Sequence, residues 1–139
     1  MDAAQARQSF STATVARMAT VGPGGVPHLV PIVFAMVTPD TIVTAVDHKP
    51  KRTLALRRLA NIAANPAVSL LADEYREDWD ALWWARADGR ARVVGIEQEP
   101  ALRELAIDAL VARYVQYAHR RPSGDLILVE IQRWSGWRA

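Results

Sequence analysis

The chain has 139 residues, of which 50% are hydrophobic and 23% are charged, with a formal net charge of +2 and no cysteine. A chain of this length predicts a single domain over residues 1–139 with an adequate core, and its nearly balanced charge argues against a dedicated nucleic-acid binder. The lack of cysteine excludes disulfides, thiolate metal sites and a cysteine nucleophile.

The N-terminal segment, residues 2–14, is rich in alanine, glutamine and arginine, which predicts a short helix. It lacks the basic start and apolar run of a signal peptide. No later stretch approaches the roughly 18 apolar residues of a membrane span. We therefore expect a soluble cytoplasmic protein that does not associate with membranes.

Three apolar, β-branched runs follow this helix and are separated by short turns. They cover residues 15–21, 26–37 and 41–46, and this spacing predicts an antiparallel meander. Pro27 and Pro31 interrupt the second run. Because proline donates no ladder hydrogen bond, we expect this strand to lie at an open edge or to contain a bulge.

The middle of the chain predicts a helix over residues 51–64, since apolar side chains recur there on one helical stripe. Strands are predicted over residues 67–72 and 81–95, and the acidic loop 73–80 joins them. The dipeptide Asp88-Gly89 predicts a bulge in the longer strand. This part of the chain adds one helix and two strands to the meander.

Pro100 opens a second strong helix, whose apolar face continues as far as Tyr117. Residues 125–134 then predict the last strand, with apolar side chains on both faces. Six strands and two to three helices make an α+β domain, and short antiparallel strands favour a barrel over a layered sheet.

The sequence lacks the usual catalytic constellations. Its three histidines, His28, His48 and His119, do not have metal-ligand spacing, and a histidine without a catalytic role is the more common interpretation of each. Neither the G-x-S-x-G motif of serine hydrolases nor a P-loop occurs. If the protein is an enzyme, a bound cofactor would therefore carry out the difficult step.

A basic segment follows the strand predicted at 41–46 and leads into the helix predicted at 51–64. Its five cations, with no acid among them, are Lys49, Lys51, Arg52, Arg57 and Arg58. A helix N-terminus, lysine charges, arginine forks and the hydroxyl of Thr53 together suit a phosphate. The alternative interpretation is a basic helix face that is simply solvated.

Tryptophan is concentrated at two places. Trp83 and Trp84 lie on a predicted strand, and Trp134 and Trp137 lie near the C-terminus. Tryptophan on a strand most often packs in a core or in an interface. Beside a phosphate site, one of these side chains would also suit a flat ring.

An ordered set of segments carries a resemblance to a known family. The segments are Pro31-Ile32-Val33-Phe34, residues 41–47 (TIVTAVD), Lys49-Pro50-Lys51-Arg52, residues 59–71 (LANIAANPAVSLL) and residues 84–91 (WARADGRA). Over nearly the whole chain, this order resembles the pyridoxamine 5'-phosphate oxidase-like split-barrel superfamily. Within it, the chain is similar to the F420-dependent branch, the B-type flavin/deazaflavin oxidoreductases.

The resemblance implies a six-stranded antiparallel split β-barrel, the FMN-binding split barrel, with two to three helices. It also implies a homodimer with two equivalent cofactor sites at the subunit interface. Reduced coenzyme F420, a deazaflavin, would give hydride to a small organic substrate. An isologous dimer also agrees with the apolar residues on both faces of several predicted strands.

The resemblance further implies roles for particular residues. The cofactor ring would be lined by Pro31, Ile32 and Val33 and backed by Thr44, Ala45 and Val46. The phosphate would be held by Lys49, Lys51, Arg52 and Thr53. The other subunit would contribute Trp84, Arg86, Trp137 and Arg138. No catalytic residue and no metal ligand is assigned, and His28, Tyr75 and solvent remain candidates for the proton donor.

Three alternatives to an F420-dependent reductase stay open. The first is an FMN-dependent oxidase or reductase on the same barrel, although the chain ends at Arg138-Ala139 without the C-terminal arginine-rich signature of the family's phosphate-ester oxidases. The second is a cofactor-binding or carrier protein without turnover, and the third is a heme-binding split barrel. The spread of cations over residues 49–58 favours the extended polyglutamate tail of F420 over the single phosphate of FMN.

Overall fold

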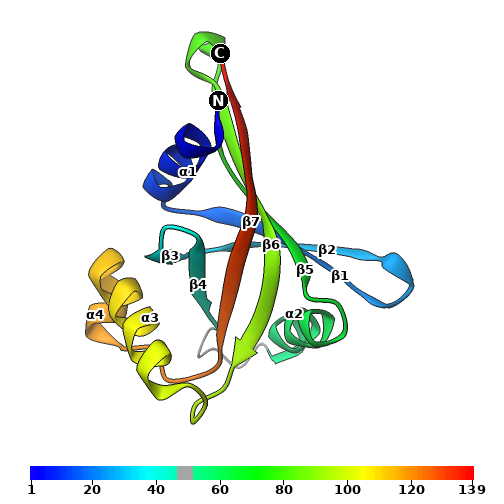
Figure 1. Ribbon diagram of the computed structural model, residues 1–139, viewed down its shortest axis with the longest axis vertical. Helices are drawn as coiled ribbons and strands as arrows, with labels where there is room; N and C mark the ends of the chain where they lie inside the picture. Colours follow the sequence, from blue (N-terminus) through cyan, green and yellow to red (C-terminus); the bar gives the residue numbers. More distant parts are fainter. Residues whose placement is uncertain (47–51) are drawn as a thin grey trace.

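The computed structural model describes residues 1–46 and 52–139 of the chain, with only the backbone described for residues 52–56 (Figure 1). In this part of the chain, seven strands form one antiparallel sheet with the order β2-β1-β5-β6-β7-β4-β3. The strands are β1 (Ala16–Val21), β2 (Pro27–Ile32), β3 (Ala35–Thr38), β4 (Thr41–Ala45), β5 (Ala67–Glu74), β6 (Trp83–Val94) and β7 (Leu126–Arg138). The helices are α1 (Ala3–Thr12), α2 (Arg52–Ala64), α3 (Pro100–Arg113) and α4 (Val115–His119), with short 3-10 turns at Pro23–Gly25 and Trp79–Ala81.

The prediction of an α+β fold is confirmed, but the predicted number of six strands is wrong. The run at 26–37 forms two strands, because the backbone hydrogen bonds between strands stop after Ile32 and resume at Ala35. Between these residues, side chains make hydrogen bonds to the backbone instead. The carbonyl of Val33 accepts a hydrogen bond from Thr44 Oγ1 at 2.8 Å. The backbone N–H of Phe34 donates to the hydroxyl of Tyr114 at 3.1 Å. The sheet is open, with β2 and β3 at its edges, which is consistent with a split barrel.

Two backbone features predicted from the sequence are present in the sheet. β2 is an edge strand, as Pro27 and Pro31 predicted. The ladder between β6 and β7 shifts its register between Asp88 and Gly89, where a bulge was predicted, but the extra residue is Gln132 of β7 rather than a residue of the longer strand β6. A Cβ atom on Gly89 would clash with the carbonyl oxygen of Glu130, and the close approach of these two strands therefore requires glycine.

The helix predicted from Pro100 to Tyr117 is in fact two helices, α3 and α4, which meet at Tyr114. Tyr114 has an extended backbone, with φ −124° and ψ 122°, and its hydroxyl lies 2.9 Å from the carbonyl oxygen of Phe34. The helix breaks where this side chain is held by a distant element. The described part of the chain thus has four α-helices rather than two or three.

Two clusters of buried side chains hold the elements together. The first packs α1 against the sheet around Phe10, whose ring centroid lies 4.9 Å from that of Phe34 and 5.4 Å from that of Trp134. The second packs α3 against β3, β4 and β7, with Leu110 and Leu128 fully buried. Figure 1 shows α1 close to the two chain ends and α3 with α4 beside β3 and β4, so the helices cover different parts of the sheet.

Helix α2 packs against β1 and β6. Its Asn61 side chain is buried and donates a hydrogen bond to Thr20 Oγ1 at 3.0 Å, and Ile62 joins the core. Residues 46–51 separate the end of β4 from the start of α2, so the helix begins where the basic segment was predicted. Over the ranges 1–46 and 52–139, no helix is both long and apolar enough to cross a membrane.

Candidate functional site

The first group of predicted site residues lies where β2 ends, beside β4. The hydrogen bond from Thr44 to Val33 brings the two predicted segments, 31–33 and 44–46, together. The side chains of Ile32 and Thr44 are buried, whereas Pro31 is exposed and Val33 is half-buried, as are Ala45 and Val46. A ligand at this edge would therefore contact the exposed and half-buried members of the group.

The residues expected to hold a phosphate fall at the limit of the described structure. Lys49 and Lys51 lie outside the described residues, and so do the side chains of Arg52 and Thr53. Their role stays a prediction. What the structure does describe is the backbone of α2, which begins at Arg52 and so places a helix N-terminus at this point of the chain.

Two further cations of the basic segment lie farther along α2. Arg57 is exposed, whereas Arg58 is half-buried, and Arg58 Nε has no hydrogen-bond partner among the described residues. Burial lowers the pKa of the Arg58 guanidinium, but from a value so high that the group stays charged. A buried N–H donor without a partner is unfavourable by itself, and an anionic ligand within reach of this Nε would relieve that cost.

The outer face of the sheet, turned away from the core, carries a groove of about 480 Å³ across β1, β2, β5 and β6. We call it the outer-face groove, and its walls include Arg17, Leu29, Leu71, Tyr75, Trp84 and Arg86. Leu29 is 66% exposed and Tyr75 is 63% exposed, so the groove presents apolar surface to solvent. An apolar hollow with a few polar side chains is typical of a ligand site or an interface.

The strand register shows which predicted residues share this face. One row across four strands consists of Arg86, Leu71, Arg17 and Pro31. On the same face, Trp137 of β7 lies opposite Trp84 of β6, whereas Arg138 lies opposite Trp83 and belongs to the other face. The structure therefore brings Trp84 and Arg86 together in the groove, with Trp137 beside them, and separates Arg138 from that group.

Trp84 and Arg86 form a prearranged pair. The guanidinium carbon of Arg86 lies 5.9 Å from the centre of the Trp84 ring. Arg86 Nε donates to Asp88 Oδ2 at 3.0 Å, and Asp88 Oδ1 accepts a hydrogen bond from Ser69 Oγ at 2.7 Å. These contacts fix an aromatic face next to a cation, which is an arrangement that suits a flat ring with negative charge.

Sequence reasoning missed the residues that complete the groove, namely Arg17, Ala19, Leu29, Ser69, Leu71 and Asp73. A signal was present in β5, where buried residues alternate with Ser69, Leu71 and Asp73 on the outward face. An apolar side chain such as Leu71 at an outward position marks a surface that something else covers.

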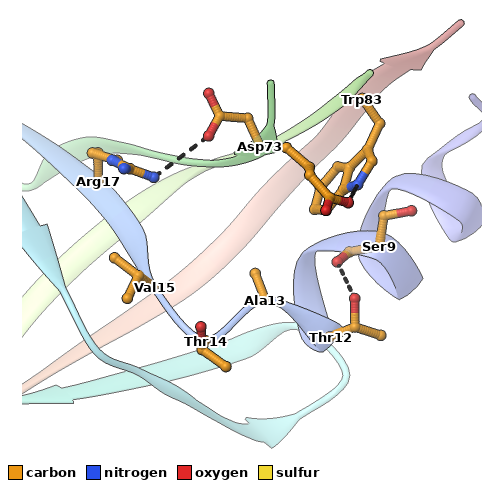
Figure 2. A pocket seen from close by; sticks show the side chains of 9 residues that line it. Ser9, Thr12, Ala13, Thr14, Val15, Arg17, Asp73 and Trp83 are labelled. Atoms are coloured by element: carbon orange, nitrogen blue, oxygen red, sulfur yellow. Dashed lines mark hydrogen bonds and ion pairs between the residues drawn. The ribbon is translucent and has the colours of Figure 1, made fainter. Parts of the chain in front are cut away.

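A second pocket, of about 420 Å³, opens beside the groove (Figure 2). We call it the acidic pocket, because Asp73 and Glu74 line it together with Trp83. Arg17 and Asp73 belong to both hollows, and the Arg17 Nη1 atom lies 3.4 Å from Asp73 Oδ1. This ion pair forms a wall that the two pockets share.

The two side chains considered as proton donors lie in different places. Tyr75 lines the outer-face groove. His28 lies opposite Thr20 on β1 and is half-buried, and its Nδ1 has no partner in the described part of the chain. Among the described residues, no three histidine, aspartate or glutamate side chains come together in an arrangement that could hold a metal ion.

Comparison with known proteins matches residues 3–138 to a family model described as pyridoxamine 5'-phosphate oxidase. No curated protein matches the chain. A conserved hypothetical protein from Mycobacterium tuberculosis has a similar structure, with 20% identity and a TM-score of 0.74 over 99% of this chain and 85% of that one.

Two further solved structures are similar and differ in what they are described as binding. A FAD-binding protein from Mesorhizobium loti has 19% identity and a TM-score of 0.71 over 98% of this chain and 94% of its own. A heme-binding protein from Mycobacterium smegmatis has 19% identity and a TM-score of 0.68 over 97% of this chain and 53% of its own. At these identities the similarity establishes the fold alone.

Proposed function

The chain belongs to the pyridoxamine 5'-phosphate oxidase family, and we propose that it is an oxidoreductase that uses a flavin-type cofactor, with reduced coenzyme F420 preferred. When bound, the reduced deazaflavin would supply hydride to a small organic substrate. The observation that carries this proposal is the half-buried guanidinium of Arg58, whose Nε has no partner among the described residues.

The position of Arg58 supports an extended anion. An α-helix rises about 1.5 Å per residue, so Arg58 lies roughly 9 Å along the axis from Arg52 at the start of α2. A phosphate held at the helix start would not reach that far. The lactyl and polyglutamate tail of F420 continues beyond the phosphate and carries carboxylates, which would give Arg58 the acceptor that it lacks.

The position of the Trp84–Arg86 pair supports a site shared between two copies of the chain. This pair lies on the outer face of β6, and β7 separates β6 from β4, whose Thr44 is buried in the core. The row that contains Ala45 reaches β6 at Val94, which lies eight residues and roughly 26 Å along the strand from Arg86, so in one copy the ring platform and the edge near residues 44–46 are too far apart to hold one cofactor ring. A homodimer would bring the platform of one copy against the edge of the other, and it would cover the exposed Leu29.

Within such a site the residues of the chain would bind and orient the reactants and exclude water. The indole of Trp84 would cover one face of the cofactor ring, and Arg86, held by Asp88, would face the polar edge of that ring. Tyr75 lines the groove, and its hydroxyl would give a proton to the substrate.

An FMN-dependent reaction is the second candidate function. The structural similarity to a FAD-binding protein from Mesorhizobium loti favours it, because the same fold there accompanies a flavin. FMN ends at its phosphate, however, and would leave Arg58 without an acceptor. A substitution of Arg58 should therefore weaken the binding of F420 more than the binding of FMN.

Titration of the purified protein with F420 and with FMN, read by quenching of cofactor fluorescence, tests the proposal. We expect F420 to bind more tightly, and we expect Arg58→Gln to weaken F420 binding by about tenfold or more, as for the loss of a charge-assisted hydrogen bond. The matched control is Arg57→Gln, one position away on the exposed side of α2. Tighter binding of FMN, or a yellow protein that retains FMN through purification, would establish the second candidate instead.

A further inference from the structure

Arg103 of α3 is buried, with 7% of its surface exposed, although arginine seldom lies inside a protein without partners. Its partners here are three backbone carbonyl oxygens. The Nη1 atom donates to the carbonyls of Val94 and Gly95 at 3.4 and 3.5 Å. The Nη2 atom donates to the carbonyl of Gly124 at 2.6 Å. The guanidinium therefore links the end of one strand to the loop that leads into another.

These contacts lie where three neighbouring strands begin or end. Val94 is the last residue of β6 and pairs with Leu126, the first residue of β7. Leu126 in turn pairs with Ala45, the last residue of β4. Figure 1 shows the start of α3 beside these strand ends. Arg103 therefore fastens α3 to the end of the row that contains Ala45.

The contacts of Arg103 continue through Gly124 to the end of β4. The residue after Gly124 is Asp125, whose carbonyl oxygen accepts a hydrogen bond from the backbone N–H of Val46 at 2.9 Å. A Cβ atom on Gly124 would lie 3.7 Å from the carbonyl oxygen of Val46, so the two backbones are in close contact. Through these contacts Arg103 holds the backbone at Val46, which is the last described residue before the basic segment.

Val46 is one end of the connection that carries the lysines expected to hold a phosphate, and α2 is the other end. The end at α2 is held by the hydrogen bond from Asn61 to Thr20 and by the burial of Ile62. A segment held at both ends binds an anion with less loss of entropy than one that must be ordered on binding. Arg103 supplies the anchor at the first end.

The shape of arginine suits this task. Its two terminal nitrogens reach carbonyls on two different segments, whereas lysine carries a single nitrogen and cannot bridge them in the same way. The support is rigid, because Ala106 and Leu110 of the same helix are fully buried against the sheet. A side chain with these properties transmits the position of α3 to the strand ends.

We propose that Arg103 is a positioning residue for the phosphate of the cofactor. It holds Val46, and with it the first end of the basic segment, in the place from which that segment binds the phosphate. The guanidinium acts through the backbone carbonyls and not by contact with the cofactor. The inference rests on the proposed function, since it needs a cofactor that carries a phosphate.

Two matched ligands test the proposal. F420 and the same deazaflavin cut back to its ribityl hydroxyl share one ring and differ in the phosphate and the tail. The ratio of their dissociation constants, read by quenching of deazaflavin fluorescence, isolates the contribution of the basic segment. We expect the truncated compound to bind the unaltered chain at least about tenfold more weakly. Arg103→Lys should reduce this ratio by about three- to tenfold and change the affinity for the truncated compound by less than about twofold.

Arg113→Lys is the matched control. Arg113 also lies on α3 and also donates to backbone carbonyls, those of Thr12 and Ala13, but at the other end of the helix. Its replacement should leave the ratio unchanged. Equal weakening of both ligands by Arg103→Lys would show a purely structural role, and an unchanged ratio would show no action on the segment; either result overturns the proposal. A ratio near one in the unaltered chain would instead reject the phosphate site of the proposed function itself.

Hydrogen exchange in the unaltered chain decides the question if Arg103→Lys does not fold. If a held Val46 favours the bound phosphate, the bound phosphate must by linkage favour a held Val46. The guanidinium protons of Arg103 and the amide of Val46 donate to Gly124 and Asp125. At saturation, F420 should slow the exchange of both about three- to tenfold more than the truncated deazaflavin does, and it should leave the guanidinium protons of Arg113 unchanged. Equal slowing by the two ligands would overturn the proposal.

Discussion

Replacing Arg58 by methionine tests two properties of its half-buried guanidinium: the free-energy cost of its unpartnered Nε in the cofactor-free protein, and its proposed role in binding F420. Methionine keeps an apolar side chain at this position of α2 and removes the guanidinium, whose Nε has no hydrogen-bond partner among the described residues. A buried donor without a partner costs about 1–3 kcal/mol, so the cofactor-free variant should be more stable by up to this amount. The same change removes a charge-assisted bond to the anion, worth about 1.5–3 kcal/mol, and should weaken F420 binding by roughly tenfold to a hundredfold.

The assay for Arg58→Met combines thermal unfolding without cofactor and fluorescence titration with F420. For a chain of this size, 1 kcal/mol corresponds to a change of about 3–5 °C in Tm. We expect Tm to rise and affinity to fall, which is the trade between stability and function expected of a ligand-binding side chain. Arg57→Met is the control, because Arg57 is exposed and should change neither quantity much. A lower Tm with unchanged affinity would show that Arg58 is a structural residue and refute the reasoning.

Three further perturbations test the basic segment, the outer face and the break between β2 and β3. The double variant Lys51→Ala, Arg52→Ala should weaken F420 binding by about tenfold or more without unfolding, with a smaller effect at high salt; unchanged affinity would leave the segment as a solvated helix face. Light scattering should find a dimer at micromolar concentration, and Leu29→Asp should give a monomer, because Leu29 is 66% exposed and lies opposite Ala19, so the change puts an unpaired charge into an apolar interface; a monomeric wild type would contradict the shared site. Tyr114→Phe should lower the free energy of unfolding in urea by about 1–3 kcal/mol, since Phe34 N–H loses its partner; an unchanged midpoint would mean that another group replaces the hydroxyl.

The parts of the fold that follow from local chemistry could be predicted from the sequence. Pro27 and Pro31 indicate an edge strand, and Asp88-Gly89 indicates a bulge. A proline without an N–H and a glycine without a side chain change the strand pairing at their own positions, so the sequence alone locates the effect. The break after β2 could not be predicted in this way. It depends on Tyr114, eighty residues away, which supplies the hydrogen bond that the ladder would otherwise make.

The candidate site could be predicted only in part, for a related reason. Trp84 and Arg86 were identified, and the structure places both in the outer-face groove. Arg17 and Leu29 were not identified, because each becomes a wall of the groove only through the pairing of β1 with β2 and β5. Their types alone carry no signal: an arginine or a leucine on a strand is common and acquires a role from its cross-strand neighbours.

The ion pair between Arg17 and Asp73 separates two hollows that differ in whether a second copy of the chain would be needed to complete them. The acidic pocket takes its walls from α1, β1, β5 and β6 of one copy of the chain, so a single copy contains the whole of it. The proposed cofactor site needs the Trp84–Arg86 platform of one copy and the β4 edge of another. Leu29 lines the groove but not the acidic pocket. A change at Leu29 that dissociates the dimer should therefore abolish cofactor binding and leave the indole N–H resonance of Trp83, which is bonded to Glu74 in the acidic pocket, unchanged. A shift of that resonance in the monomer would mean that the partner also shapes the acidic pocket, because the shared ion pair would then be positioned by the interface rather than by the sheet.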